Sequence, residues 1–193
     1  MKRMVGFEGI EAKKGLVIDS VNLYVEVPDD GINSNGQIEF RSGNILVIST
    51  GNDAVDSNYG DKAREKGWDT TAPAIICSGA KVTAVSLIGP PEEGLDCDNS
   101  PIAITGGVVV GMGAKAGPMG SSPLERLCTQ PFRLLSEFTC VPEKPILLKE
   151  EDGSIVHEFT LPALSTTRDK DVPKQYSFTH VILSAPDKIE IAQ

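Results

Sequence analysis

Chemistry would most naturally lie at the glycine-rich stretch 102–120, but the side chains that could bind a metal are oxygen-bearing residues of the polar stretch 51–71. They are Asp53, Asp56, Asn58 and Asp61. Carboxylate and amide oxygens are the hard ligands that calcium prefers, but the spacing of these four differs from that of an EF-hand loop. We therefore regard them as weak candidates for a metal site and favour a solvated loop.

A glycine cluster follows the apolar run 102–110 and invites a comparison with phosphate-binding loops. Gly111, Gly113 and Gly117 are spaced differently from the dinucleotide fingerprint, and Lys115 lacks the Ser or Thr that a P-loop requires after its lysine. The sequence therefore predicts a structural role for these glycines, either a turn or a close packing contact, and no nucleotide cofactor.

Histidine catalysis has little support in the sequence. The chain has two histidines, His157 and His180, and each lies inside a predicted strand with apolar neighbours. A histidine in a strand is more often a satisfied structural residue than a general base. We predict no catalytic residue and no cofactor, and whether the protein is an enzyme stays open, with a non-enzymatic role favoured.

The four cysteines lie 20, 31 and 12 residues apart, without the close pairs of structural zinc sites. Free buried thiols are the favoured state. A disulfide between Cys128 and Cys140 is the alternative in an oxidising compartment.

Charge and hydropathy exclude several classes of function. The 193-residue chain carries a net charge of −9 and has no basic stripe, so a nucleic-acid partner is not expected. No run approaches the roughly 20 apolar residues of a membrane helix. The amino end lacks the apolar segment of a signal peptide. These observations predict a cytoplasmic or virion-associated protein without a membrane partner.

Short strand-like segments separated by Gly, Pro, Asn and Asp fill most of the chain. Residues 21–27 alternate between apolar and polar, and a turn at 151–153 predicts a hairpin. Residues 102–120 contain the most buried-looking strand. We find no internal repeat. The pattern predicts a mainly β chain, a single domain 1–193 built as an antiparallel β-sandwich or barrel.

One short helix is expected near 122–137. Ser122 and Glu125 match a capping box with Pro123 at the first helical position, and Pro131 interrupts the helix. One or two further helical turns are expected at 61–66, with Gly67 as the C-terminal stop, inside the long polar loop 51–71. Trp68 on this loop either closes the edge of the core or faces a partner.

Residues 43–52 resemble a short stretch, a strand followed by Ser-Thr-Gly-Asn, of some bacterial surface-anchored β domains. The resemblance covers about a twentieth of the chain. No residue role is carried over from it.

The leading hypothesis is a non-enzymatic structural or interaction protein that self-assembles or docks on a fixed partner, such as a virion or tail component or a surface-layer subunit. The alternative is a small-molecule-binding or enzymatic β domain whose site is formed by the 51–71 loop and the glycine-rich 111–120 loop. Self-association is expected because open sheets leave unpaired strand edges. The segment 75–88, in which Lys81 is the one charged residue, is the expected edge.

Overall fold

The computed structural model describes residues 7–98, 100–114 and 123–193. The expectation of a mainly β chain is confirmed, because strands make up 52% of the residues and helix 4%. None of the described helices is both long and apolar enough to cross a membrane.

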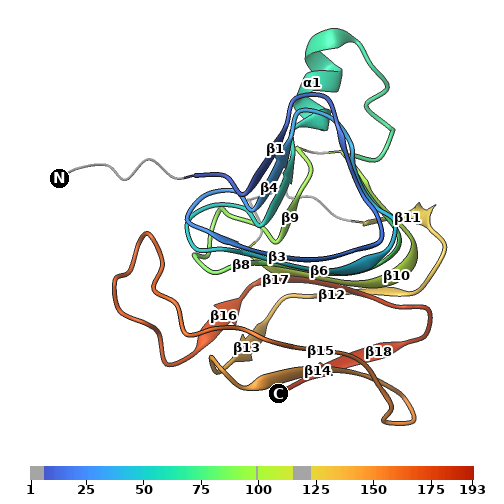
Figure 1. Ribbon diagram of the computed structural model, residues 1–193. Coiled ribbons are helices and arrows are strands. Elements are labelled where there is room, and N and C mark those ends of the chain that lie inside the picture. The colour runs from blue at the N-terminus through green and yellow to red at the C-terminus, as the bar shows by residue number, and fades with distance from the viewer. Residues whose placement is uncertain (1–6, 99, 115–122) are drawn as a thin grey trace.

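The amino-terminal half winds into four stacked turns of parallel strands, a triangular solenoid seen end-on in Figure 1. The first turn contains β1 (Ile10–Ala12), β2 (Leu16–Ile18) and β3 (Val21–Val27). The second contains β4 (Ile32–Ser34), β5 (Ile38–Phe40) and β6 (Gly43–Ser49). The third contains β7 (Val55–Ser57) and the long β8 (Ile75–Ser86), and the fourth contains β9 (Leu95–Asp96) and β10 (Ile102–Gly113).

The stacking register reveals a structural repeat that the sequence analysis missed. Ile10 pairs with Ile32, and Ile32 pairs with Val55, at spacings of 22 and 23 residues. The next turn is longer because helix α1 (Tyr59–Lys66) is inserted between β7 and β8. Paired positions such as these have aliphatic residues in each turn, but few other positions have the same residue type. The repeat is therefore hard to recognise in the sequence.

Helix α1 confirms the expected helical turns before Gly67. That glycine adopts the left-handed conformation with φ of 68°, and the Trp68 N–H donates to the carbonyl of Ala63 at 2.8 Å. Glycine accepts this conformation without the steric cost of a β-carbon.

The carboxyl-terminal half adds eight further strands among the described residues; the first pairs with β10 in parallel and the others pair antiparallel. The eight strands are β11 (Pro123–Cys128), β12 (Phe132–Leu135), β13 (Phe138–Cys140), β14 (Pro145–Glu150), β15 (Ile155–Thr160), β16 (Tyr176–Phe178), β17 (His180–Ser184) and β18 (Ile189–Ala192). β17 lies between β10 and β12 in the large sheet, whereas β15, β14 and β18 form a separate sheet beneath it (Figure 1). The expected hairpin at 151–153 is confirmed as the β14–β15 connection.

One sheet therefore serves two cores. Its inner face closes the solenoid with side chains such as Ile45, Val82 and Val109. Its outer face packs on the β14–β15–β18 sheet through side chains that include Ile48 and Val110. This second core has the form of a β-sandwich, as expected, and the shared sheet fits a single domain.

The antiparallel prediction holds for β12–β18. It is wrong for the solenoid, where β1–β10 pair in parallel, and for β11, which pairs with β10 in parallel. Parallel strands are buried on both faces and so read as continuous apolar runs. The run 102–110 has this character. Its burial was read correctly from the sequence except at residues 105–107, which are exposed or half-buried, but burial does not specify strand direction.

The helix predicted near 122–137 is wrong. Residues 123–128 and 132–135 form strands β11 and β12, which pair with β10 and β17. Ser122 lies outside the described residues, so its capping role is not addressed. Helix propensity and caps contribute about 1 kcal/mol each, which is less than the combined backbone pairing and side-chain packing that a sheet edge offers.

The expected edge at 75–88 is also wrong. Strand β8 is central, because it pairs with β5 and β6 on one side and with β10 on the other. Its low charge fits this central position and the burial of residues 82–86. Among the described strands, the ends of the large sheet are β12 and β11 on one side and β2 and β3 on the other.

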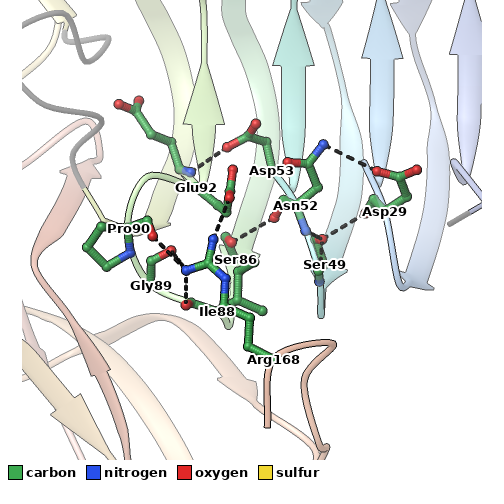
Figure 2. Close-up of polar contacts among 12 residues, drawn as sticks. Asp29, Ser49, Asn52, Asp53, Ser86, Ile88, Gly89, Pro90, Glu92 and Arg168 are labelled. Carbon is green, nitrogen blue, oxygen red and sulfur yellow. Dashed lines mark hydrogen bonds and ion pairs between the residues drawn. The ribbon is translucent and has the colours of Figure 1, made fainter. Parts of the chain in front are cut away.

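Arg168 ties the carboxyl-terminal half to a corner of the solenoid (Figure 2). Its guanidinium donates to the carbonyl of Pro90 at 2.6 Å and to the carboxylate of Glu92 at 2.8 Å. The neighbouring Thr167 N–H donates to the carbonyl of Thr50 at 2.8 Å. The loop after β15 is thereby fastened to two successive turns.

None of the four cysteines forms a disulfide, so the Cys128–Cys140 pairing is absent from this structure. The predicted burial holds for Cys77, Cys97 and Cys140, whereas Cys128 is partly buried. Burial raises the pKa of the Cys77 thiol to about 12. A thiol in such surroundings is inert as a nucleophile because little thiolate forms.

Candidate functional site

The outer face of the shared sheet changes from polar to apolar along one row of paired residues. Asn22 on β3 pairs with Asn44 on β6, which pairs with Lys81 on β8, which in turn pairs with Val108 on β10. The β14–β15–β18 sheet covers the apolar end of this row. The polar end lies at the margin of the sandwich and forms one wall of a groove.

This groove has a volume of about 710 Å³ and lies between the outer face of β3, β6 and β8 and the strand β15. Residues 155–160 form the opposite wall. Its apolar lining includes Ile155, which is 53% exposed, and its aromatic lining includes Tyr24, which is 55% exposed. A groove that combines apolar surface with a few fixed polar groups is the usual form of a small-molecule site.

Two amides are held in place on the solenoid wall. The Asn44 Nδ2 group donates to the Asn22 Oδ1 atom at 2.9 Å. Each amide has two donor hydrogens and a carbonyl oxygen, so this contact leaves donors on Asn22 and an acceptor on Asn44. Both side chains are exposed, and the parallel register fixes their separation.

Tyr24 lies beside these amides on the same face of β3. Its hydroxyl donates to the carboxylate of Glu26, two residues along the strand. Desolvation and this hydrogen bond raise the pKa of Tyr24 to about 12, so the phenol stays neutral at physiological pH. The hydrogen bond orients the ring and leaves it exposed at the groove.

Three polar residues hold the two walls together. The Lys81 ammonium donates to the carbonyl of Val156 at 3.1 Å, and the Thr83 hydroxyl lies 2.8 Å from the His157 Nε2 atom. Burial, followed by the nearby charge of Lys81, lowers the pKa of His157 to about 4. His157 is therefore neutral at pH 7, and its ring stacks on Phe159 with centroids 5.6 Å apart.

The sequence-derived metal candidates lie on another face of the solenoid. The carboxylate of Asp56 accepts from Asn58 at 3.0 Å and from Asn33 at 3.3 Å, and Asp53 accepts from the backbone N–H of Glu93. Asp61 lies on α1 and pairs with Arg64 instead. Asp53, Asp56 and Asn58 lie in or beside β7 within one turn, and Asp61 is separated from them on α1.

No three His, Cys, Asp or Glu side chains converge as a metal site within the described parts of the chain. The metal assignment therefore stays a prediction. Desolvation raises the pKa of Asp53 to about 9 and that of Asp56 to about 8, and neighbouring carboxylates add to both shifts. Asp56 pairs with Asn33 of the preceding turn and with Asp96 of the following turn, because parallel strands place equivalent positions of successive turns directly above one another.

The structural role predicted for the glycines after the apolar run is confirmed where they are described. Gly111 and Gly113 belong to strand β10, and residues 115–120 lie outside the described chain. A β-carbon on Gly113 would lie 2.6 Å from the backbone nitrogen of Gly94. This close approach explains the glycine without a ligand, and its φ lies outside the left-handed region.

The other two residues singled out in the sequence, His180 and Trp68, pack against neighbouring residues of the fold. His180 is buried in β17. Trp68 is 46% exposed, its ring stacks on Tyr59 with centroids 6.1 Å apart, and the Lys66 ammonium lies 4.6 Å above it. The tryptophan therefore packs on its own helix and leaves part of its surface open to solvent.

Sequence reasoning missed the groove. The alternation of residues 21–27 does place Asn22, Tyr24 and Glu26 on the polar face of one strand. The recurrence of asparagine at positions 22 and 44 was a further indication of a shared polar surface. It could be recognised only once the two turns were known to stack. The contribution of β15, more than 100 residues away in the chain, has no local signal.

Comparison with known families gives one match. Residues 6–79 match a family model described as carbohydrate-binding domain-containing protein. The match covers less than half of the chain and includes β3 and β6, which carry Asn22, Tyr24 and Asn44. Searches among curated proteins and among solved structures return no match. The similarity favours a binding role in the coarse sense.

Proposed function

We propose that this protein binds carbohydrate, and that the groove between β3–β6–β8 and β15 is the binding site. The observation that carries the proposal is the overlap between the groove wall and the segment similar to a carbohydrate-binding family. The groove differs from the site at the 51–71 and 111–120 loops that belonged to the alternative hypothesis of the sequence analysis. A virion, tail or surface-layer role has no support in the comparisons.

The chemistry of the groove suits a sugar. A pyranose has hydroxyl groups that both donate and accept hydrogen bonds, and it has faces of C–H groups that pack against aromatic rings. Asn22 and Asn44 offer the polar groups, and the ring of Tyr24 offers the apolar surface. Because these side chains are held by hydrogen bonds before a ligand arrives, little ordering cost opposes binding.

The charges favour a neutral sugar over an acidic one. Lys81 donates to a carbonyl of β15, His157 is neutral at pH 7, and Glu26 lies beside Tyr24. An acidic sugar would meet a nearby carboxylate. It would have to compete with Val156 for the ammonium of Lys81.

The test is calorimetric titration of the full chain with a panel of neutral and acidic oligosaccharides. The Tyr24→Ala and Asn44→Ala variants should each weaken binding of a neutral ligand by about tenfold, which corresponds to about 1.4 kcal/mol. Trp68→Ala is the matched control, because it removes another half-exposed aromatic ring that lies outside the groove. Retention of full affinity by both groove variants, or absence of binding to every sugar at millimolar concentration, would reject the proposal.

A further inference from the structure

Strand β3 is an open edge of the large sheet. Among the described strands it pairs with β6 alone. The carbonyl of Val27 accepts from the N–H of Thr50 on the β6 side at 2.9 Å. Because backbone groups of successive residues in a strand point to opposite sides, those of Asn22, Tyr24 and Glu26 point away from β6.

This edge has little of the protection that usually prevents strand addition. Charged side chains, prolines, bulges or covering segments commonly block exposed edges. Residues 21–27 pair with β6 without a register shift, Pro28 follows the strand, and Glu26 is its one charged residue. Val21 at the edge is 38% exposed.

The sequence of β3 is complementary to itself when reversed. An antiparallel pairing centred on Tyr24 places Tyr24 opposite its own copy and Asn22 opposite Glu26. These are the three residues whose backbone groups point outward, so the pairing forms six backbone hydrogen bonds. The register uses all seven residues of the strand and keeps Pro28 outside it.

The same register also places complementary side chains opposite one another. On the outer face an amide meets a carboxylate twice, which allows a charge-assisted hydrogen bond and avoids facing like charges. On the inner face Val21 meets Val27 and Leu23 meets Val25, so aliphatic side chains at the open end of the solenoid gain apolar neighbours. One strand thus satisfies hydrogen bonding, charge and packing together.

We propose that β3 is a self-docking edge and that its occupant is β3 of a second copy of this chain. The resulting contact is isologous, with a two-fold axis at Tyr24. It joins two nine-stranded sheets into one and places the two grooves side by side on the same face. The inference rests on the strand edge and does not depend on what the groove binds.

The first test uses opposite charges at Asn22 in sedimentation velocity measurements on the full chain. Wild type should show a species of about twice the 20.5 kDa monomer mass that increases with concentration. Asn22→Asp should raise the dimer dissociation constant at least about tenfold, because it creates two like-charge contacts with Glu26, and Asn22→Lys should lower it. Leu134→Asp and Leu134→Lys, at an exposed position of the opposite edge strand β12, are the matched controls and should change nothing.

The second test probes the register by cross-linking. Directly opposed residues of a hydrogen-bonded antiparallel pair have Cα atoms about 5.5 Å apart, within the range for a disulfide. Oxidation of the Tyr24→Cys variant should give a covalent dimer on a non-reducing gel, and Leu134→Cys should not. The proposal is overturned by a monomer at about 200 μM, by equal effects of the two Asn22 charges, or by cross-linking at Leu134 in place of Tyr24.

Discussion

The two faces of the shared sheet differ although the same strands build both. On the inner face, Leu23, Ile45 and Val82 repeat an aliphatic residue from turn to turn. On the outer face the neighbouring row runs from asparagine to lysine to valine. The inner face is constrained by stacking, which requires similar shapes at equivalent positions. The outer face is free to vary, and the groove is formed there.

The largest expected effect is a difference in the free energy of unfolding between substitutions on the inner face and on the outer face. Ile45→Ala, at a position only 2% exposed, should cost about 2 to 5 kcal/mol in free energy of unfolding because it leaves a cavity in the solenoid core. Asn44→Ala, one residue earlier on the exposed face, should cost less than about 1 kcal/mol. Urea unfolding of both variants measures the difference. Equal losses would mean that the outer row also supports the core.

The second effect is a loss of stability at alkaline pH that originates in the solenoid. The pKa values of Asp53 and Asp56, about 9 and 8 in the folded chain, lie far above the ordinary value of 3.8. The unfolded chain is already ionised at pH 7, so the contribution of these carboxyls falls as pH rises through their folded pKa values. We expect the free energy of unfolding to drop by about 1 to 3 kcal/mol between pH 7 and pH 9.

Two variants, compared between pH 7 and pH 9, test whether the buried carboxyls cause this loss of stability. Asp53→Asn should flatten the pH dependence, whereas Asp61→Asn, on the surface of α1, should leave it unchanged. Below about pH 6.5 the depressed pKa of His157 acts in the opposite direction, because that residue must gain a proton on unfolding. Unfolding midpoints are therefore compared from pH 7 to pH 9. A flat wild-type profile in this range would contradict the prediction.

The smallest effect concerns the fastening of the two halves. Arg168→Ala removes the donors to Pro90 and Glu92 and should cost about 1 kcal/mol, because Arg168 is about half exposed and screened by solvent. Arg168→Lys should recover part of this, since one ammonium replaces a forked donor. Amide hydrogen exchange should increase in residues 162–175 of the alanine variant while the solenoid strands stay protected. Faster exchange in β8 would show that the Arg168 contacts support the core as well.

The sequence by itself determined the features that depend on neighbouring residues. The hairpin at 151–153, the helical turn that ends at Gly67 and the alternation of 21–27 were all predicted from residues within a few positions of each other. The burial of 102–110 was also evident, because a strand covered on both faces must be apolar throughout.

Only the tertiary structure decided which strands are neighbours. Parallel pairing joins residues about 22 positions apart, and nothing local distinguishes an apolar strand that pairs this way from one in an antiparallel sheet. The same cause explains the misplaced edge at 75–88 and the strands found where a helix was expected at 123–135. It also explains the groove, because Asn22, Asn44 and His157 become neighbours only after the solenoid has stacked and β15 has folded back beneath it.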